Sequence, residues 1–309
     1  MASSMRNEQW LAFSQELANI IEKVGSSIVA VRGGGRLGAS GIHWRPGLIV
    51  TTSHTIRRDE ELSITLPDQS SAPATLVGRD PSTDVAALKF ENAKRLSAIK
   101  TSSPTGLKVG HFVAAVGRSQ LGDLAASAGI VARLGAAWRT WRGGDIDQLL
   151  RPDIRLYPGQ SGSALVNAQG EVLGMNTAAL ARMAAITVPT ATVDRVLDEL
   201  LEHGHIRRPY LGVAMQTVAI PEDVGKKLKL ELLAGLLVVH VEPDAPGSRA
   251  GLMLGDVILR IDGKAVGDLS VMQDAIRALR TGDQAKLAVL RGGELREFAV
   301  AAGDRPMRK

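Results

Sequence analysis

Three polar residues far apart in the chain could together carry out nucleophilic catalysis. Ser161 lies in the segment Pro158–Leu165, between glycines and directly before an apolar stretch, where a serine hydroxyl can be exposed. Gly159 lets the backbone bend so that its own N–H and that of Ser161 can point at one spot. Two such donors form an oxyanion hole, which contributes roughly 10²–10³ in rate for each donor. Gly-Ser turns are also common without any chemistry, so this segment needs supporting residues.

A nucleophilic serine needs a base, and His54 is the best placed of the six histidines. It follows the apolar segment 48–53, and a histidine at the end of a strand can face a cleft. Asp84 directly precedes another buried-looking segment, 85–88, where an unpartnered carboxylate would be costly. The imidazole N–H of His54 would satisfy that carboxylate, which would in turn hold the histidine tautomer. A purely structural role for His54 is the alternative.

Composition argues against several other kinds of chemistry. The chain has no cysteine, which excludes disulfides, thiolate nucleophiles and cysteine-based zinc sites. It has no His-Glu-x-x-His motif, so no metal site is expected. The net charge is +5, but the basic residues are scattered and aromatics are only 3% of the chain. We therefore expect no nucleic-acid partner, and the lack of an apolar run of about 18 residues predicts no membrane span.

The order of predicted elements indicates two domains in 309 residues. Residues 6–24 have the apolar spacing of an amphipathic helix, whose large Trp10 and Phe13 side chains could pack on their own domain or form a subunit contact. Short strands and turns from 27 to 189 predict one barrel-like unit or two small barrels. A helix is predicted over 192–202, ending at Gly204.

The remaining third of the chain predicts a small α+β module. Strands are expected near 210–215, 235–241, 256–261, 284–290 and 295–300, with one helix at 270–279. The predicted division is an N-terminal helix, 1–24, a first domain, 25–202, a polar linker, 203–209, and a second domain, 210–309.

The segments around the three polar residues resemble the HtrA (Deg) family of serine proteases, in the chymotrypsin-like order His, Asp, Ser. The resemblance covers about residues 25–303, and its motifs in the first domain are Thr51-Thr52-Ser53-His54, Asp80-Pro81-Ser82-Thr83-Asp84-Val85-Ala86-Ala87-Leu88-Lys89, Ser127-Ala128-Gly129-Ile130-Val131, Pro158-Gly159-Gln160-Ser161-Gly162 and Gly170-Glu171-Val172-Leu173-Gly174-Met175-Asn176-Thr177-Ala178.

The resemblance implies a mainly β fold, a chymotrypsin-like double β-barrel followed by one PDZ domain. It implies a serine endopeptidase with His54, Asp84 and Ser161 as the triad, acting without a cofactor on unfolded or damaged polypeptides, and a homotrimeric assembly. Leu156 and Leu180 match positions that line the family's S1 pocket, the pocket for the residue on the acyl side of the cleaved bond. Small or medium aliphatic residues are therefore expected there.

The second domain resembles the family's PDZ module. Tyr210-Leu211-Gly212-Val213 is similar to its carboxylate-binding loop, and 243–252 and 255–258 match its core signature. The N–H groups of Leu211, Gly212 and Val213 could clamp a peptide C-terminus, with Ile276 lining a side-chain pocket and the strand edge pairing with the peptide. The alternative is that 210–215 is simply a strand.

Four residues depart from the family pattern around the serine. Ser163 and Ala164 replace a glycine and a proline, Tyr157 replaces asparagine, and Arg155 replaces a small residue. They affect the expected resting state of the oxyanion loop and the acyl-side preference, and Arg155 could favour an acidic residue if it points inward.

Two other functional hypotheses remain open. One is a scaffold that binds peptides through its PDZ domain without cleaving them, and the other is a nucleic-acid-binding protein, which rests on the isoelectric point alone. No secretory signal is visible in the first 24 residues, whereas the family resemblance suggests an extracytoplasmic location.

Overall fold

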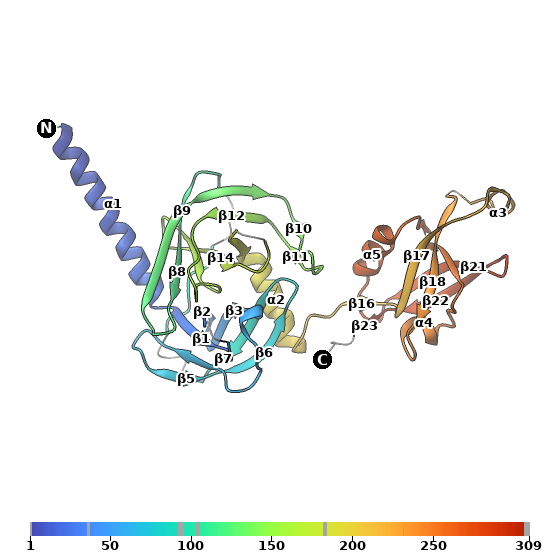
Figure 1. The fold of residues 1–309 in the computed structure, drawn as a ribbon, viewed down its shortest axis with the longest axis horizontal. Helices are drawn as coiled ribbons and strands as arrows, with labels where there is room; N and C mark the ends of the chain where they lie inside the picture. The colour runs from blue at the N-terminus through green and yellow to red at the C-terminus, as the bar shows by residue number, and fades with distance from the viewer. Residues whose placement is uncertain are drawn as a thin grey trace. The chain divides into compact units, whose positions relative to one another are not determined.

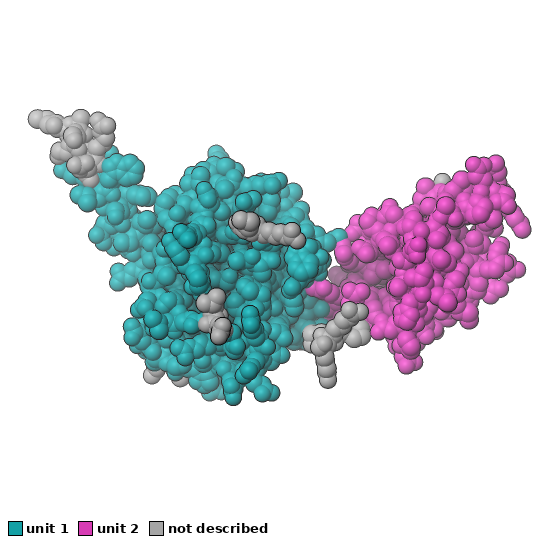
Figure 2. Space-filling view, in the orientation of Figure 1, with its two compact units in different colours: residues 1–206 teal, residues 207–309 magenta. Residues whose placement is uncertain are grey.

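The computed structural model describes residues 2–35, 38–91, 96–102, 106–181, 184–230 and 232–305, with side chains in the first helix from residue 8 onward. The chain forms two compact units, residues 1–206 and 207–309 (Figure 2). Within the described residues, no helix is both long and apolar enough to cross a membrane.

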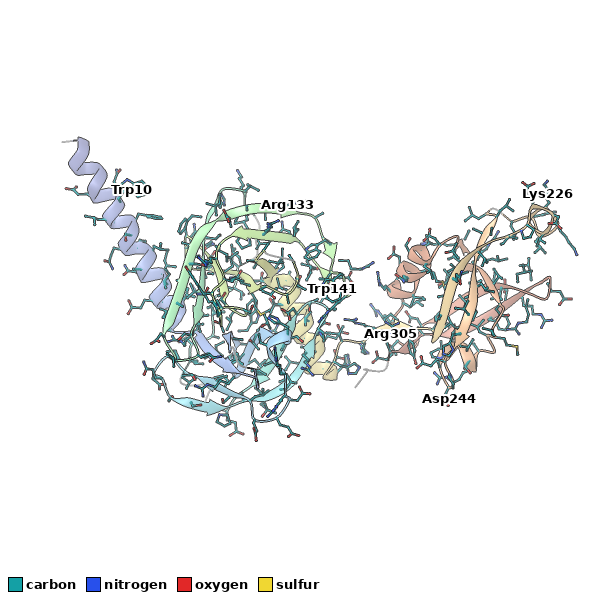
Figure 3. The ribbon with its side chains drawn as sticks, viewed as in Figure 1. Trp10, Arg133, Trp141, Lys226, Asp244 and Arg305 are labelled. Atoms are coloured by element: carbon teal, nitrogen blue, oxygen red, sulfur yellow. The ribbon has the colours of Figure 1, made fainter. Side chains whose placement is uncertain are left out.

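The chain begins with helix α1, Ala2–Gly25, which projects from the first unit (Figure 1). Its inner half packs on that unit, because Leu17, Ile20 and Ile21 contact the core. Phe13 makes an edge contact with the ring of Phe112 at 5.4 Å between centroids. Trp10 lies further out and is 69% exposed (Figure 3). The helix therefore packs within its own unit at one end and leaves a large aromatic side chain uncovered at the other.

The first half of unit 1 is a seven-stranded antiparallel sheet, ordered β5-β4-β1-β2-β3-β7-β6. Its apolar side chains, among them Val29, Ile49 and Leu88, form one core. The strands are β1 Ile28–Arg32, β2 Ala39–Arg45, β3 Leu48–Thr52, β4 Ser63–Thr65, β5 Ser71–Pro73, β6 Thr75–Asp80 and β7 Val85–Lys89, and a single 3-10 turn, η1 Ser53–Thr55, follows β3.

The second half of unit 1 is a closed barrel, ordered β12-β15-β14-β13-β8-β9. Its interior contains Val113, Leu150 and Leu165. A larger core between the two halves joins Val50 and Met175 to helix α2, Thr190–His203, which ends at Gly204. The strands are β8 Phe112–Arg118, β9 Leu124–Gly135, β12 Leu149–Asp153, β13 Ala164–Asn167, β14 Val172–Thr177 and β15 Ile186–Pro189, with a separate pair β10 Trp138–Arg139 and β11 Asp145–Ile146.

Unit 2 is an antiparallel sheet, ordered β17-β18-β19-β21-β22, packed with helices around its own core. Its strands are β16 Pro209–Tyr210, β17 Val213–Ala219, β18 Ala234–Val241, β19 Val257–Ile261, β20 Lys264–Ala265, β21 Gln284–Arg291, β22 Glu294–Ala301 and β23 Gly303–Asp304.

The expectation of a single helix in the second domain is wrong. The described part of unit 2 contains α3 Glu222–Leu228, α4 Pro246–Arg249 and α5 Leu269–Ala278. The two extra helices are too short for an apolar period to be visible. Local signals do mark them: acidic residues begin α3 and lysines end it, and Pro246 occupies the first turn of α4.

Candidate active site

His54 and Asp84 are brought together by the pairing of β3 with β7. Thr52 lies opposite Val85 in that ladder, so the residues that follow β3 and precede β7 are neighbours. The ring Nδ1 of His54 lies 2.8 Å from Oδ2 of Asp84, and the backbone N–H of His54 donates to Oδ1 at 2.9 Å. This two-point contact fixes the histidine ring by its Nδ1 side and leaves Nε2 for chemistry.

The Asp84 carboxylate is buried, and both of its oxygens take part in hydrogen bonds. Only 2% of the residue is exposed, and its φ of 60° is rare for a residue other than glycine. The hydroxyl of Thr177, from the second barrel, also donates to Oδ2. Strained backbone of this kind persists only where the surrounding structure enforces it, and it is concentrated at functional sites.

A preceding turn holds Asp84 in place. Asp80 is 3% exposed, and its carboxylate accepts from the hydroxyls of Ser82 and Thr83 at 2.6 and 2.7 Å. The hydroxyl of Thr140, which lies between β10 and β11, then donates to the Ser82 carbonyl. The sequence reasoning missed Asp80, although Asp-Pro-Ser-Thr is a pattern typical of such side-chain-bonded turns.

Ser161 lies half-buried in a tightly wound loop between β12 and β13. The Gln160 N–H donates to the Tyr157 carbonyl at 2.9 Å, and the Gln160 side chain accepts from the Tyr157 N–H at 3.0 Å. The N–H groups of Gly162 and Ser163 donate to Asn176 and Gln160. Gly159 has a φ of 88°, a backbone conformation that residues with a Cβ atom rarely adopt.

Two N–H groups of this loop are left over. Within the described residues, the N–H groups of Gly159 and Ser161 donate to no protein atom, whereas those of Gln160, Gly162 and Ser163 all do. Alternate N–H groups around a serine are the donors that an oxyanion hole requires.

Ser40 of β2 joins this loop to the first sheet, a role that the sequence did not reveal. Its N–H donates to the Ser161 carbonyl at 2.9 Å, and its hydroxyl donates to the Gly159 carbonyl at 3.0 Å. The same hydroxyl accepts from the N–H of Arg118 at 2.9 Å. The residue is completely buried.

Strand β14 connects the loop to the His54–Asp84 pair. Asn176 accepts the Gly162 N–H through its carbonyl, and the next residue, Thr177, bonds Asp84. No hydrogen bond joins the Ser161 hydroxyl to the His54 ring in the described structure. Such bonds are often long without substrate and tighten when it binds.

The departures at 163 and 164 fit the packing behind the loop. The Ser163 hydroxyl accepts from the Asn176 side chain at 3.1 Å, and Asn176 in turn accepts from Thr187 at 2.7 Å. All three side chains are buried, and Ala164 is in the core. The Ser163 hydroxyl thus belongs to a buried polar network that supports the loop.

The two leucines predicted for the S1 pocket lie in different surroundings. Leu156 lines a pocket of about 710 Å³, which we call the arginine pocket, whereas Leu180 is 7% exposed and belongs to the core between the barrels. The arginine pocket is lined by Ala132, Arg133, Arg151, Pro152, Asp153, Ile154, Arg155, Leu156, Ala178, Ala184 and Ala185.

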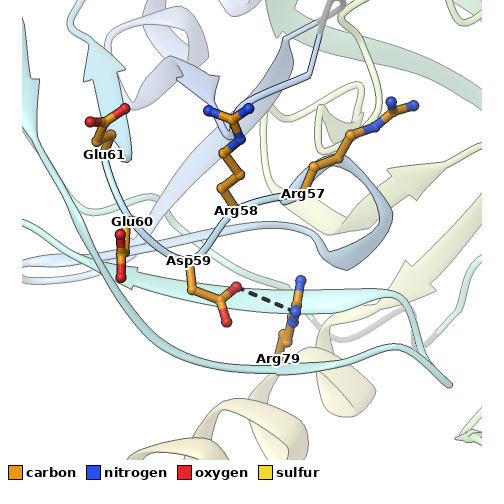
Figure 4. Close-up of a pocket in the computed structure, with 6 residues that line it drawn as sticks. All are labelled: Arg57, Arg58, Asp59, Glu60, Glu61 and Arg79. Atoms are coloured by element: carbon orange, nitrogen blue, oxygen red, sulfur yellow. Dashed lines mark ion pairs between the residues drawn. The ribbon is translucent and has the colours of Figure 1, made fainter. Parts of the chain in front are cut away.

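A second pocket of about 330 Å³ follows His54 in the chain and is shown in Figure 4. We call it the balanced pocket, because it has as many cations as carboxylates. Asp59 and Arg79 form an ion pair across it at 3.3 Å. Its lining is Arg57, Arg58, Asp59, Glu60, Glu61 and Arg79.

In unit 2, the loop between β16 and β17 carries the predicted carboxylate-binding residues. Gly212 has a φ of 71°, and the carbonyls of Leu211 and Gly212 accept from Gly247 and Glu242 at 2.7 and 2.8 Å. The N–H groups of Leu211 and Gly212 have no backbone partner among the described residues. Val213 starts an edge strand that pairs with β18 alone in the described sheet.

The other two predicted peptide-binding residues flank this loop. Tyr210 is half-buried and pairs with Gly303, and Ile276 lies on α5, which is close to β16 and β17. Ile276 and Val213 are both partly buried against the same core. The edge, the loop and an apolar helix face therefore belong to one region.

Comparison with known proteins identifies both units. A model of trypsin-like peptidase domains matches residues 39–175, and a model of PDZ domains matches 209–302. A DegP-like periplasmic serine endoprotease of Pseudomonas fulva is 34% identical over 285 residues, which are 89% of this chain and 58% of that protein. Its counterpart in Chlamydia pneumoniae is 30% identical over 265 residues, 84% of this chain and 53% of that protein. The chain thus spans little more than half the length of these relatives.

Solved structures give the same result. The HtrA-type protease AlgW with a decapeptide superposes with a TM-score of 0.70 at 25% identity, covering 94% of this chain and 99% of that one. A serine endoprotease from Yersinia pestis superposes with a TM-score of 0.70, also at 25% identity, covering 93% and 97%. The predicted fold, a chymotrypsin-like unit followed by a PDZ domain, is confirmed.

Proposed function

Because the chain belongs to the HtrA family, with a trypsin-like peptidase domain followed by a PDZ domain, we propose that it is a serine endopeptidase that uses His54, Asp84 and Ser161. The observation that carries the proposal is the unpartnered pair of N–H groups at Gly159 and Ser161, in a loop that β14 connects to a carboxylate-held histidine.

The geometry supports a two-step acyl transfer. Ser161 Oγ attacks the peptide carbonyl while Nε2 of His54 takes its proton, and Asp84 stabilises the resulting imidazolium through Nδ1–H. The N–H groups of Gly159 and Ser161 hold the oxyanion. His54 then gives the proton to the leaving amine, and water, deprotonated by His54, releases the acyl group from Ser161.

The test is casein cleavage at neutral pH by the purified chain. Ser161→Ala should lower the rate by several powers of ten with the fold retained, because the nucleophile is lost. Ser26→Ala, which removes an exposed hydroxyl that donates to the Lys23 carbonyl and to no other described residue, should cleave normally. A wild type that binds peptides without cleaving casein would favour the scaffold hypothesis instead.

We also propose cleavage after small or medium aliphatic residues. Leu156 and four alanines line the arginine pocket beside the nucleophile loop, and their apolar surface leaves an acyl-side lysine or arginine unpaired. Mass spectrometry of casein fragments tests this, and a majority of cleavages after lysine or arginine would rule it out.

For unit 2, we propose that peptides with apolar C-termini bind at Tyr210–Val213 and Ile276 and stimulate cleavage. The unpartnered N–H groups suit a terminal carboxylate, and the open edge of β17 suits strand addition. Calorimetry should show weaker binding after C-terminal amidation, and equal affinity for both forms would contradict the site. Deletion of 208–309 should leave basal cleavage, since no proposed triad residue lies there.

The family and the exposed end of α1 support a homotrimer held partly by this helix. Large aromatic side chains often dominate interfaces, and Trp10 is 69% exposed, with an edge contact to the ring of Phe13. Light scattering on the wild type and on Trp10→Ala/Phe13→Ala tests both parts. A monomeric wild type would refute the trimer. A variant that stays trimeric would show that the α1 aromatics do not hold the trimer and that the helix only packs on its own unit.

We infer an extracytoplasmic location and a role in degrading unfolded or damaged polypeptides, because the relatives are named periplasmic endoproteases. Fractionation of cells that express the native gene tests the location. Comparing the cleavage of reduced, unfolded casein-like substrates with that of a folded protein tests the role.

A further inference from the structure

The arginine pocket has an excess of positive charge next to the proposed nucleophile loop. Three arginines and one aspartate line it, whereas the balanced pocket has equal numbers of cations and carboxylates. Arg133 lies on β9, Arg151 on β12, and Arg155 immediately precedes Leu156. The positive side chains therefore belong to the same pocket as the predicted S1 residue.

Arg133 and Arg151 are direct partners across the β9–β12 ladder, so their side chains leave the same face. Like charges opposite one another destabilise a sheet. No described carboxylate lies within ion-pair distance of either guanidinium, and Asp153 lines the pocket without pairing with them. Both arginines are exposed, so solvent and salt screen their repulsion and both guanidinium groups are accessible to an anion.

Arg155 is held in a defined place beside them. Its guanidinium carbon lies 5.2 Å from the ring centroid of Tyr157, and its carbonyl accepts from the Ser127 hydroxyl at 2.7 Å. A guanidinium stacked on an aromatic ring still has its N–H edge free for a planar anion, and carboxylates match that edge. Tyr157 and Arg155, two of the departures from the family pattern, thus act together.

We propose that the arginine pocket selects polypeptide substrates with an aspartate or glutamate within the last few residues before the cleaved bond. The inference rests on the proposed endopeptidase function and specifies its substrate class. The substrate carboxylate binds between Arg133 and Arg151, with Arg155 closing the side next to Leu156.

The experiment uses the chain with both units and quenched fluorescent peptides. Each peptide has an aliphatic residue directly before the cleaved bond and either Glu or Gln at one of the three positions that precede this residue. At one or more positions, Glu should give about fivefold higher kcat/KM than Gln, as expected for two exposed ion pairs. The preference should shrink at about 0.5 M salt, because exposed charges are then screened.

Arg133→Gln/Arg151→Gln should bring the Glu-to-Gln ratio of kcat/KM close to one. Lys89→Gln/Lys108→Gln is the matched control, because it removes two exposed positive charges from the same unit outside the pocket. The control should keep the fivefold preference. A ratio near one in the wild type, or a ratio unchanged by the arginine substitutions, would overturn the proposal.

A binding measurement separates this inference from the proposed function. Fluorescence anisotropy of a labelled acidic peptide with Ser161→Ala should show affinity that Arg133→Gln/Arg151→Gln lowers by a similar factor. If no peptide is cleaved but this binding is present, the endopeptidase function fails while the anionic site remains. If peptides are cleaved without any preference for Glu over Gln, the anionic site fails while the endopeptidase function remains. Stronger binding of duplex DNA than of the acidic peptide would also overturn the proposal.

Discussion

The nucleophile loop of unit 1 and the β16–β17 loop of unit 2 are built alike and anchored differently. Each has a glycine at positive φ, Gly159 or Gly212, and each leaves backbone N–H groups without partners in the described structure. The first loop has side-chain anchors in addition to backbone bonds, because the Ser40 hydroxyl donates to the Gly159 carbonyl and the Gln160 side chain accepts from the Tyr157 N–H. The second is anchored by backbone bonds and packing, through Gly247 and Glu242.

The difference matches what each loop is proposed to do. An oxyanion hole must place its donors within tenths of an ångström of a charge that exists only in the transition state, and side-chain hydrogen bonds from a rigid sheet provide that restraint. A terminal carboxylate and an added strand tolerate small adjustments, so backbone bonds suffice. Substitutions of single side chains should therefore damage the first loop far more than the second.

The largest effect should come from Asp84→Asn. This substitution should nearly abolish cleavage by unit 1 and leave peptide binding by unit 2 intact. Asparagine keeps the shape of the side chain but presents an amide to His54 Nδ1, which favours the wrong tautomer. We expect kcat for casein or peptide cleavage to fall by about 10⁴, while calorimetry shows unchanged peptide binding by unit 2. Retention of more than a tenth of the wild-type kcat would contradict the role of Asp84.

Ser40→Ala should have the next largest effect. Loss of the hydroxyl frees the Gly159 carbonyl and leaves the Arg118 N–H without its partner, so the oxyanion donors lose their fixed position. We expect kcat to fall by about 10–100-fold with KM little changed, because the donors act in the transition state. A merely structural role would lower the unfolding midpoint without this split between kcat and KM, and Ser26→Ala is the control.

Asp84 and Ser40 show which parts of the site could be predicted from the sequence and which could not. His54, Asp84 and Ser161 were identified because each stands beside an apolar strand or glycine turn, and because their order matches a family. Ser40 could not be identified from the sequence, because a serine in a buried strand has no local signature. Its partners in the loop are 119 and 121 positions away. The same applies to the Arg133–Arg151 contact, which depends on the register of two strands 18 positions apart.

The two short helices of unit 2 were missed for a different reason. Helices α3 and α4 have 7 and 4 residues, fewer than an apolar period needs, and only their capping signals could have identified them. The longer helices, α1, α2 and α5, were predicted correctly because their apolar faces repeat over more than two turns.

Gly212→Ala should have a smaller effect, and on the other unit. It should weaken peptide binding by unit 2 and leave cleavage by unit 1 intact. An added Cβ would lie 2.1 Å from the Cβ of Ala245, so the loop must shift and its N–H groups move. We expect peptide affinity in calorimetry to fall about tenfold, a typical cost of overpacking, while casein cleavage without peptide is unchanged. Gly282→Ala, which also has positive φ but no neighbour within 4 Å of the added Cβ, is the control. Equal losses in both variants would assign the effect to backbone strain alone.

The smallest effect concerns acid stability, where the two units should differ in the pH at which they weaken. Burial lowers the pKa of His43 in unit 1 below its usual 6.5, with the backbone of Ser97 opposing the shift. In unit 2, burial alone would raise the pKa of Asp256, but the Arg291 guanidinium and the Met253 N–H hold it below 3.8.

The direction follows from which state binds protons more readily. A lowered histidine pKa favours the neutral folded form, so its stabilising effect is complete above pH 6.5 and is lost as the pH falls through 6.5 toward the folded value. A lowered aspartate pKa stabilises above 3.8 and is lost only below it. Between pH 7.5 and 5, unit 1 should therefore lose stability from this source and unit 2 should not.

The four tryptophans, Trp10, Trp44, Trp138 and Trp141, all lie in unit 1, so urea unfolding followed by their fluorescence reports that unit alone. The fluorescence midpoint should fall between pH 7.5 and 5, while the part of the far-UV circular dichroism transition due to unit 2 stays in place. His43→Gln, whose side-chain carbonyl can still accept from the Gly47 N–H that His43 Nε2 accepts at 3.1 Å, should flatten the dependence. A midpoint that falls equally in His43→Gln would show that other groups carry the acid sensitivity of unit 1.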